Sequence, residues 1–181
     1  MDHLKKKIKI IIIEKNKGKY LIKINNNFIK TPEGNLIELP SMKLAKILLK
    51  DYELNLKTKN INIVSPIKIT NTAIDKIKAK HNFYIDEITY NLNNDMICYF
   101  SSAPEELVNL QNKKWLPLIN YMKSSYDIDL IYTSNLFAID QKIESLLKLQ
   151  NILKEKNIFK LSAFYTLSQI TKSIIISLAL V

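Results

Sequence analysis

The spacing of apolar residues changes near Ser41, which restricts the chain to a β-rich beginning followed by helices. Before this point, Lys7–Glu14 is rich in β-branched residues and Lys19–Ile24 alternates apolar with polar side chains, as strands do. Asn25–Asn27 and Pro32–Asn35 contain the residue types of tight turns. The first part of the chain is therefore predicted to form a small antiparallel sheet or a partly closed barrel.

From Ser41 onward, apolar residues recur at helical spacing. Ser41 can cap the first helix, and Ser65-Pro66 supplies a cap and a first-turn proline to a second helix. A short extended link, Ile61–Val64, is expected between these two helices. Further helices are predicted over residues 83–93, 102–125, 139–156 and 158–180.

Two short apolar segments interrupt the helical part. Met96–Phe100 and Ile128–Thr133 are predicted as strands close enough to pair. Ser102 and Glu105 have the spacing of a capping box, which predicts the start of the long helix that follows. The chain is thus an α+β protein with two parts. A small N-terminal antiparallel β-rich domain is expected at residues 1–60, followed by a larger, mainly α-helical domain at 61–181.

The last stretch, Leu161–Val181, is long and apolar enough to raise the question of a membrane span. Lys172 and a series of hydroxyl and amide side chains interrupt it, which favours a helix buried within the α domain. The sequence stops at Leu180-Val181 without a capping residue. We therefore expect the helical domain to be incomplete.

The formal charge of +10 comes entirely from lysine, because all 27 basic residues are Lys and none is Arg. Residues 1–80 hold 18 lysines and 7 acids, whereas residues 81–181 hold 9 lysines and 10 acids. Abundant Lys, Ile and Asn are typical of an AT-rich genome, so a solvated lysine face is the favoured interpretation. The alternative is a basic peripheral protein whose front half binds nucleic acid or an anionic membrane. The absence of Arg argues against nucleic acid.

Residues for catalysis or metal binding are scarce. The two histidines, His3 and His81, have no acid, Ser or Cys at a catalytic spacing, and a metal site needs three or four ligands. Cys98 lies in an apolar run and is expected to be buried. Asp86-Glu87 and Glu105-Glu106 are expected at helix starts. The sequence predicts a binding protein without a catalytic residue, metal or cofactor, and an enzyme acting on a small molecule is the third hypothesis.

Four segments, taken in order, carry a family resemblance: TPEGNLIELPSMKLAKIL at Thr31–Leu48, ITNTAIDKI at Ile69–Ile77, DMICYFSSAPEELVNLQNKKWLPLINY at Asp95–Tyr121, and FKLSAFYTLSQITKSIIISLALV at Phe159–Val181. Together they resemble the assembly chaperones of the F-type ATP synthase catalytic head that act on its alpha subunit. The resemblance covers about residues 18–181.

The resemblance implies a small β domain followed by a larger α domain, and a function without nucleotide or cofactor. It implies that the chain binds the free alpha subunit and prevents its aggregation until the beta subunit assembles. The expected location is the bacterial cytoplasm, or the mitochondrial matrix in a eukaryote. A monomer is expected, with no nucleic-acid partner and peripheral membrane contact at most.

Five residues match motifs of this family and are the candidates for partner binding. Asn71 and Asp75 belong to the NTAID segment, and Trp115, Pro117 and Tyr121 belong to the Trp-containing segment. Aromatic and rigid residues are typical interface anchors. The spacing of Trp115 fits a core position as well, and Asn71 with Asp75 can instead bridge helices internally.

The chain departs from the family in two respects. The family usually has Gly where Lys172 stands, directly before Ser173. Family members also continue beyond the residue corresponding to Val181 with further helices and an acidic, Trp-Gly-containing region. Local packing near Lys172 is therefore expected to differ from that of the family.

Overall fold

A computed structural model describes residues 11–57, 64–135 and 137–180. Several sequence-based expectations lie outside these residues, among them the first part of the Lys7–Glu14 strand, most of the Ile61–Val64 link, and the position of His3.

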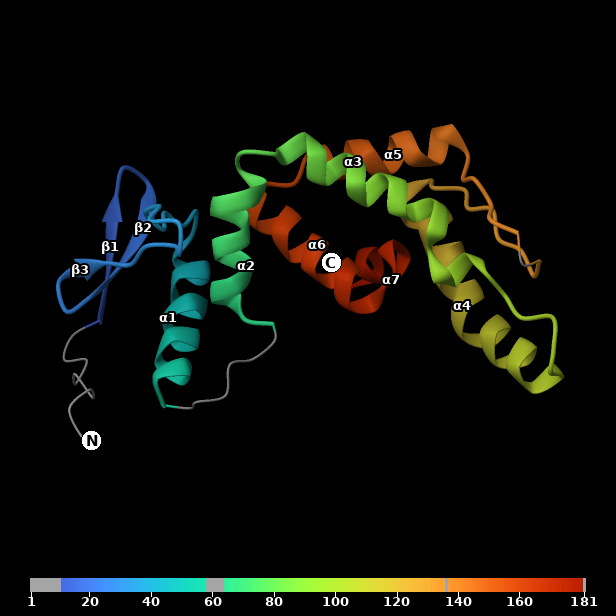
Figure 1. Ribbon diagram of the computed structural model, residues 1–181, viewed down its shortest axis with the longest axis horizontal. Coiled ribbons are helices and arrows are strands. Elements are labelled where there is room, and N and C mark those ends of the chain that lie inside the picture. Colours follow the sequence, from blue (N-terminus) through green and yellow to red (C-terminus); the bar gives the residue numbers. More distant parts are fainter. Residues whose placement is uncertain (1–10, 58–63, 136, 181) are drawn as a thin grey trace. The chain divides into compact units, whose positions relative to one another are not determined.

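The contacts between residues divide the chain into two compact units, Met1–Ala79 and Lys80–Val181 (Figure 1). Each unit has its own hydrophobic core and is described separately. The domain boundary expected between residues 60 and 61 falls in the undescribed segment 58–63 and stays a prediction.

The first unit begins with an antiparallel sheet in the order β1 (Ile11–Asn16), β2 (Lys19–Ile24) and β3 (Asn27–Phe28). Both connections are two-residue turns with positive φ throughout: 45° and 78° at Lys17-Gly18, and 50° and 66° at Asn25-Asn26. Turns of this kind match the twist of paired strands, and Gly and Asn adopt their conformation most readily. The predicted antiparallel sheet and the asparagine turn are confirmed.

The segment after β3 joins the same sheet before the first helix begins. Tyr20 and Leu39 exchange two backbone hydrogen bonds of 2.9 Å, and a bridge joins Lys30 to Leu36. The core of this unit consists of side chains that are at most 2% exposed: Leu21, Ile22, Ile37, Leu39, Ala45, Leu48, Ala73 and Ile77.

Two helices complete the first unit, and both begin where their capping residues predicted. α1 (Met42–Lys57) starts after Ser41, whose Oγ accepts a 3.2 Å hydrogen bond from the backbone N–H of Leu44. α2 (Pro66–Thr72) starts after Ser65, whose Oγ accepts from a backbone N–H in the first turn. In Figure 1 the strands lie on one side of α1 and α2 on the other, in agreement with the contacts.

α2 continues directly into a π-helix, η1 (Ala73–Ile77). The wider turn is visible in the 2.9 Å hydrogen bond from the N–H of Lys78 to the carbonyl of Ala73, five residues earlier. Sequence periodicity did not predict this insertion. π-Helical turns are rare and occur frequently at functional sites.

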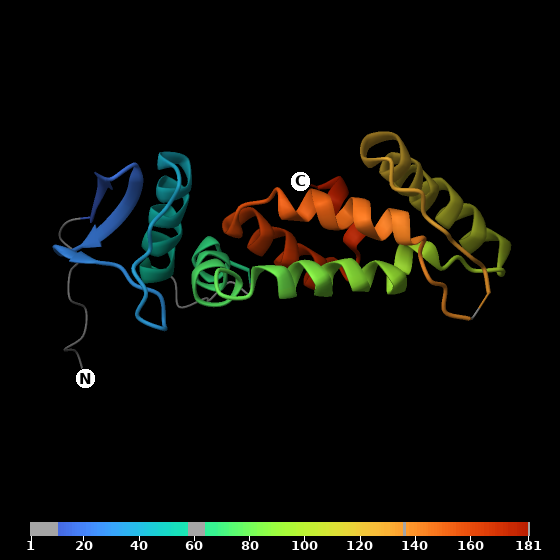
Figure 2. The same ribbon diagram turned by 90° about the horizontal axis from the view of Figure 1, so that it is seen from above.

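The second unit is helical. α3 and α5 lie side by side, and α6 packs against α3 (Figures 1 and 2). α7 contacts both α4 and α6. The elements of the second unit are α3 (His81–Asn91), η2 (Leu92–Asn94), η3 (Met96–Cys98), α4 (Glu105–Tyr126), α5 (Ile143–Lys154), α6 (Ile158–Thr171) and α7 (Ile174–Ala179). The α+β fold class is confirmed.

The two strands predicted in this unit are wrong. Met96–Cys98 is a short 3-10 helix, because the side chain of Asp95 caps it by accepting from the backbone N–H of Ile97. Only a single parallel bridge, Tyr99 with Thr133, joins the two segments within the described residues. The segments were therefore correctly expected to lie together, but not as strands.

The predicted capping box is also wrong. α4 begins at Glu105 with Pro104 at the N-cap position, and no side chain caps it. The nearby hydroxyl that does bond the backbone belongs to Ser101, which donates to the carbonyl of Ala103. Glu105 and Glu106 lie in the first turn, as expected. Asp86-Glu87 lies in the middle of α3 instead of at its start.

The helix predicted over 158–180 is divided into α6 and α7. Lys172 ends α6 in the left-handed conformation with φ 54°, which turns the chain. Ser173 then caps α7 by accepting from the N–H of Ile176 at 3.0 Å. α5 starts at Ile143, later than the predicted residue 139. No helix in the described part of the chain has the length and hydropathy needed to cross a membrane.

Candidate functional site

The groups that most often perform catalysis are not arranged for it in the described residues. Cys98 is buried, and burial raises the pKa of its thiol to about 12. A thiol with this pKa stays protonated near neutral pH and is a poor nucleophile. No group of three or more His, Cys, Asp and Glu side chains comes together to hold a metal ion in the described residues.

Asp75, one of the predicted candidates, fixes the turn at residues 31–35 to η1. Its Oδ1 accepts a 2.6 Å hydrogen bond from the hydroxyl of Thr31 and a 2.8 Å bond from the side-chain amide of Asn35. Desolvation acts to raise the pKa of Asp75, but hydrogen bonds from Thr31, Asn35 and the backbone of Glu33 outweigh it and hold the pKa below its ordinary value. Asp75 is therefore an anion that orders this turn.

Asn71 stands one helical turn before Asp75, and both line the same pocket. The side-chain oxygen of Asn71 is buried, and it has no hydrogen-bond partner among the residues that the structure describes. A buried acceptor without a partner costs about 1–3 kcal/mol. The pocket has a volume of about 350 Å³ and is lined by Pro32, Glu33, Lys68, Asn71, Thr72, Asp75 and Lys76. We call it the Asn71 pocket.

The other three candidates lie on α4 in the second unit. Trp115 is half-buried and packs edge-on against Phe100, with ring centres 5.6 Å apart. Phe100 also packs against the exposed ring of Tyr132 at 5.3 Å. Pro117 is exposed within α4, and Tyr121 is partly exposed beside Tyr126. Trp115 is thus neither a full core residue nor a free surface residue.

We call Phe100, Trp115 and Tyr132 the aromatic cluster. The first turns of α4, which precede Trp115, expose further apolar side chains. Leu107 and Leu110 are both exposed, Leu110 by 54%. Phe137, in the loop before α5, is 82% exposed. The second unit therefore presents apolar side chains that its own core does not use.

Sequence reasoning did not single out Asp95 as a site residue, although the structure gives it a central position. Asp95 is 1% exposed and accepts three hydrogen bonds of 3.0 Å, from the N–H groups of Ile97 and Ile175 and from the hydroxyl of Ser173. Burial raises its pKa, and these hydrogen bonds only partly offset that effect. Asp95 thereby fastens the start of α7 to η3.

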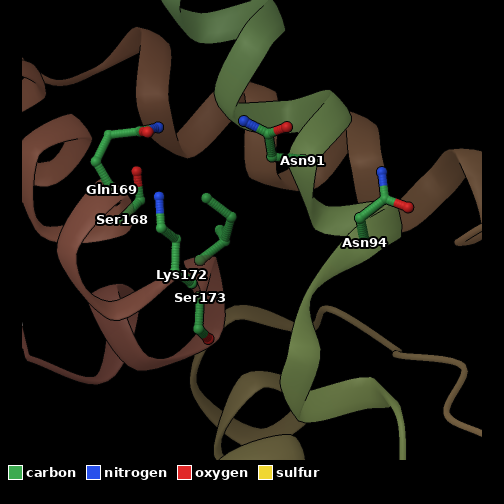
Figure 3. A pocket seen from close by; sticks show the side chains of 7 residues that line it. Asn91, Asn94, Ser168, Gln169, Lys172 and Ser173 are labelled. Atoms are coloured by element: carbon green, nitrogen blue, oxygen red, sulfur yellow. The ribbon is translucent and has the colours of Figure 1, made fainter.

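A polar pocket of about 280 Å³ opens beside this junction (Figure 3). In Figure 3, Asn91 at the end of α3 and Asn94 in η2 lie on one side of the pocket, and Ser168 and Gln169 of α6 lie on the other. The complete lining is Asn91, Asn94, Ser168, Gln169, Lys172, Ser173 and Ile174. One side of this pocket is the α6–α7 junction, which was predicted as continuous helix.

The partners of Asp75 were also missed. Thr31 and Asn35 are ordinary turn residues in the sequence. They donate hydrogen bonds to the carboxylate of Asp75 only because the fold places them beside η1. Their one sequence signal is that two polar side chains flank the Pro-Glu-Gly turn.

Comparison with known proteins agrees with the resemblance described above. A sequence profile of the ATP12 chaperone protein family matches residues 5–123, well over half of the chain. Among solved structures, a protein from Agrobacterium tumefaciens is 25% identical and superposes with a TM-score of 0.86 over 94% of this chain and 64% of that chain.

Two structures of Atp12 from Paracoccus denitrificans share the fold. One is 22% identical with a TM-score of 0.82, and the other, a point mutant, is 24% identical with a TM-score of 0.81. Each alignment covers 93% of this chain and 72% of the Paracoccus chain. The chain belongs to the ATP12 chaperone protein family, the ATP synthase assembly chaperones that its sequence segments predicted.

Proposed function

We propose that this chain binds the free alpha subunit of the F-type ATP synthase catalytic head and prevents its aggregation until the beta subunit assembles. The observation that carries the proposal is the match to the ATP12 chaperone family over residues 5–123. The alpha subunit as client is the specific partner that the sequence resemblance implies.

The exposed apolar side chains of the second unit support this proposal. A subunit awaiting its neighbour exposes an apolar surface, and such surfaces drive aggregation. Leu110 and Phe137 are exposed beyond one half, and the aromatic cluster adds rigid rings at partial exposure. Aromatic side chains such as Trp and Tyr are enriched among the residues that supply most of the binding energy at interfaces. An interface built from them covers a client while remaining exchangeable.

The five residues named from the sequence remain candidates for this contact. We assign Trp115 and Tyr121 as partly exposed aromatic anchors and Pro117 as a rigid exposed neighbour on the same helix. Asn71 and Asp75 belong to the Asn71 pocket of the first unit.

This function requires no catalysis and no cofactor, because covering an apolar surface is a binding event. We expect the chain to act as a monomer in the bacterial cytoplasm, or in the mitochondrial matrix of a eukaryote.

The direct test is co-expression of this chain with the alpha subunit of the same organism, followed by co-purification and measurement of soluble alpha. We expect alpha to become soluble, to co-elute with the chain and to be released when the beta subunit is added. Soluble alpha that never co-elutes, although both proteins are folded, contradicts the proposal.

A pair of variants locates the contact on the second unit. Leu110→Ser removes an exposed apolar side chain from α4, whereas Asn109→Ser changes its neighbour without removing apolar area. We expect Leu110→Ser to lower the yield of soluble alpha severalfold and Asn109→Ser to leave it unchanged. Equal yields from the two variants would remove this part of α4 from the interface.

The second candidate function is peripheral binding to an anionic membrane, and the exposed face of α1 favours it. This face alternates three lysines with three apolar side chains, the pattern of helices that lie on anionic lipid. The residues are Met42, Lys43, Lys46, Ile47, Lys50 and Leu54. Flotation with vesicles containing phosphatidylserine tests it: this candidate requires binding that falls with added salt, and no flotation rejects it.

A further inference from the structure

The polar pocket of Figure 3, which we call the Lys172 pocket, is lined by one positive charge and, among the described residues, by no carboxylate. The charge is the ammonium of Lys172, which forms no ion pair in the described part of the chain. A volume of about 280 Å³ lies just below the roughly 300–1,000 Å³ of most ligand pockets. A ligand of this pocket is therefore small, and the positive charge favours an anion over a cation.

Three carboxamide side chains line the pocket together with this charge: Asn91, Asn94 and Gln169. None of the three side chains forms a hydrogen bond with another described residue. Each carboxamide has an NH₂ group with two donors, and it can turn this group toward an acceptor. Asn91 and Asn94 lie on one side of the pocket and Gln169 on the other (Figure 3). Donors are thus available to a bound anion from two sides.

The two serines of the lining are already engaged as donors. The hydroxyl of Ser168 donates to the carbonyl of Tyr165 at 2.8 Å, and the hydroxyl of Ser173 donates to Asp95 at 3.0 Å. Ser173 thus links the pocket to a buried carboxylate that is not part of the lining. This nearby negative charge disfavours a ligand with more than one negative charge. A carboxylate, with a single charge, is therefore favoured over a phosphate group, which carries nearly two.

The backbone at Lys172 is a second unusual feature of the pocket. Lys172 ends α6 in the left-handed conformation with φ 54°, which Gly adopts without the steric cost that a lysine bears. Residues held in sparsely populated conformations are frequent at functional sites. In Figure 3, Lys172 lies on the same side of the pocket as Ser168 and Gln169. The steric cost and the unpaired ammonium thus occur at the same residue.

We infer that the Lys172 pocket binds a single carboxylate group, with the ammonium of Lys172 as its counter-ion and the carboxamides of Asn91 and Gln169 as hydrogen-bond donors. The carboxylate belongs to a small free molecule or to an acidic side chain of a partner protein. The same protein groups bind it in both cases, so the pocket can be tested with acetate alone.

The test is a titration of the isotope-labelled full chain with sodium acetate, followed by NMR at the side-chain amides of Asn91 and Gln169. Sodium chloride at the same ionic strength is the reference. We expect acetate, and not chloride, to shift both signals. Lys172→Met keeps the aliphatic length but removes the charge, and it should weaken acetate binding about tenfold. Lys160→Met, which removes a lysine of α6 outside the pocket, should bind like the native chain.

A further variant removes a donor without changing the end of α6. Gln169→Met should weaken acetate binding severalfold with an unchanged Tm, because Gln169 is exposed on α6. Three results overturn the inference: no acetate-specific shift in the native chain, an equal loss of binding in Lys160→Met and Lys172→Met, or tighter binding of phosphate than of acetate.

Binding of the alpha subunit by the two lysine variants then identifies the source of the carboxylate. Weaker binding by Lys172→Met than by Lys160→Met assigns it to an acidic side chain of this client, whereas equal binding assigns it to a small free molecule. If the native chain does not bind alpha at all, the proposed function fails while the acetate titration still decides the pocket.

Discussion

Each unit uses one aspartate to fasten a stretch of chain to a helix, but the two aspartates work in opposite environments. Asp75 stands at a surface pocket and is held by Thr31 and Asn35. Asp95 is 1% exposed and is held by backbone N–H groups and Ser173. Each accepts several hydrogen bonds, yet the pKa of Asp75 is lowered and that of Asp95 is raised. Burial, and not the number of donors, therefore decides the sign.

The largest expected effect is at Asp95. Asp95→Ala leaves the N–H groups of Ile97 and Ile175 without an acceptor in a site that water reaches poorly. We expect a loss of about 3–5 kcal/mol in the free energy of unfolding, measured by urea denaturation. Asp95→Asn, which keeps one acceptor oxygen, should lose less. A loss at Asp95→Ala smaller than that at Asp75→Ala would contradict the comparison.

Asp75→Ala is expected to cost less, about 1–2 kcal/mol, because the donors it abandons lie nearer the surface and can bond water. Urea denaturation is again the measurement. Lys76→Ala changes the next residue, which forms no ion pair among the described residues, and serves as the control with little expected change. Equal losses in the two variants would remove the special role of Asp75.

A smaller change in stability is expected from a substitution of Lys172, the residue at which α6 ends. Lys172 has φ 54°, a conformation that costs about 1–2 kcal/mol in an L-residue but little in Gly. Since Gly also loses more entropy on folding, Lys172→Gly should raise stability by a net amount of about 0.5–1 kcal/mol, seen as a higher Tm. Lys160→Gly, inside α6, should instead destabilise by about 1 kcal/mol. A lower Tm for Lys172→Gly would show that the lysine side chain has a structural role.

The smallest expected effect is on the pH dependence of stability, and its sign differs between the two aspartates. The contribution of Asp75 is present above the ordinary pKa of 3.8 and is lost as the pH falls through its lowered folded pKa. The raised pKa of Asp95 means that the folded state gains stability as the pH falls through it. Between pH 7 and pH 3, Asp75→Asn should lose less stability than the native chain and Asp95→Asn more. The reverse order would refute both assignments.

The parts of the fold that depend only on residues close by in the sequence could be predicted from it. Ser41 and Ser65 cap their helices, and the asparagine turn has the positive φ that Asn tolerates, because these choices are made within a few residues. The strand predicted at Met96–Phe100 is wrong. The apolar pattern of this segment does not indicate that the side chain of Asp95 caps a 3-10 helix there. The break at Lys172 carries no Gly or Pro to mark it.

For the candidate sites too, the sequence predicted what depends on nearby residues and missed what depends on distant ones. Asn71 and Asp75 were chosen by motif and do line one pocket, but their spacing alone could not reveal the wall supplied by the turn at residues 31–35. Trp115 was weighed as core or anchor, and it lies between the two because Phe100 covers one side of it. Contacts that join distant segments, such as Asp95 with Ser173, leave no local signal in the sequence.

The two aspartates also differ in when their partners become available during synthesis of the chain. Thr31 and Asn35 precede Asp75, so this turn can be fastened as soon as Asp75 has left the ribosome. Asp95 must wait for Ser173 and Ile175, which follow it by 78 and 80 residues. At translation rates of about 5–20 residues per second, this delay is roughly 4–16 s. During that time the carboxylate of Asp95 accepts hydrogen bonds from water, and the core of the second unit lacks the residues of α7.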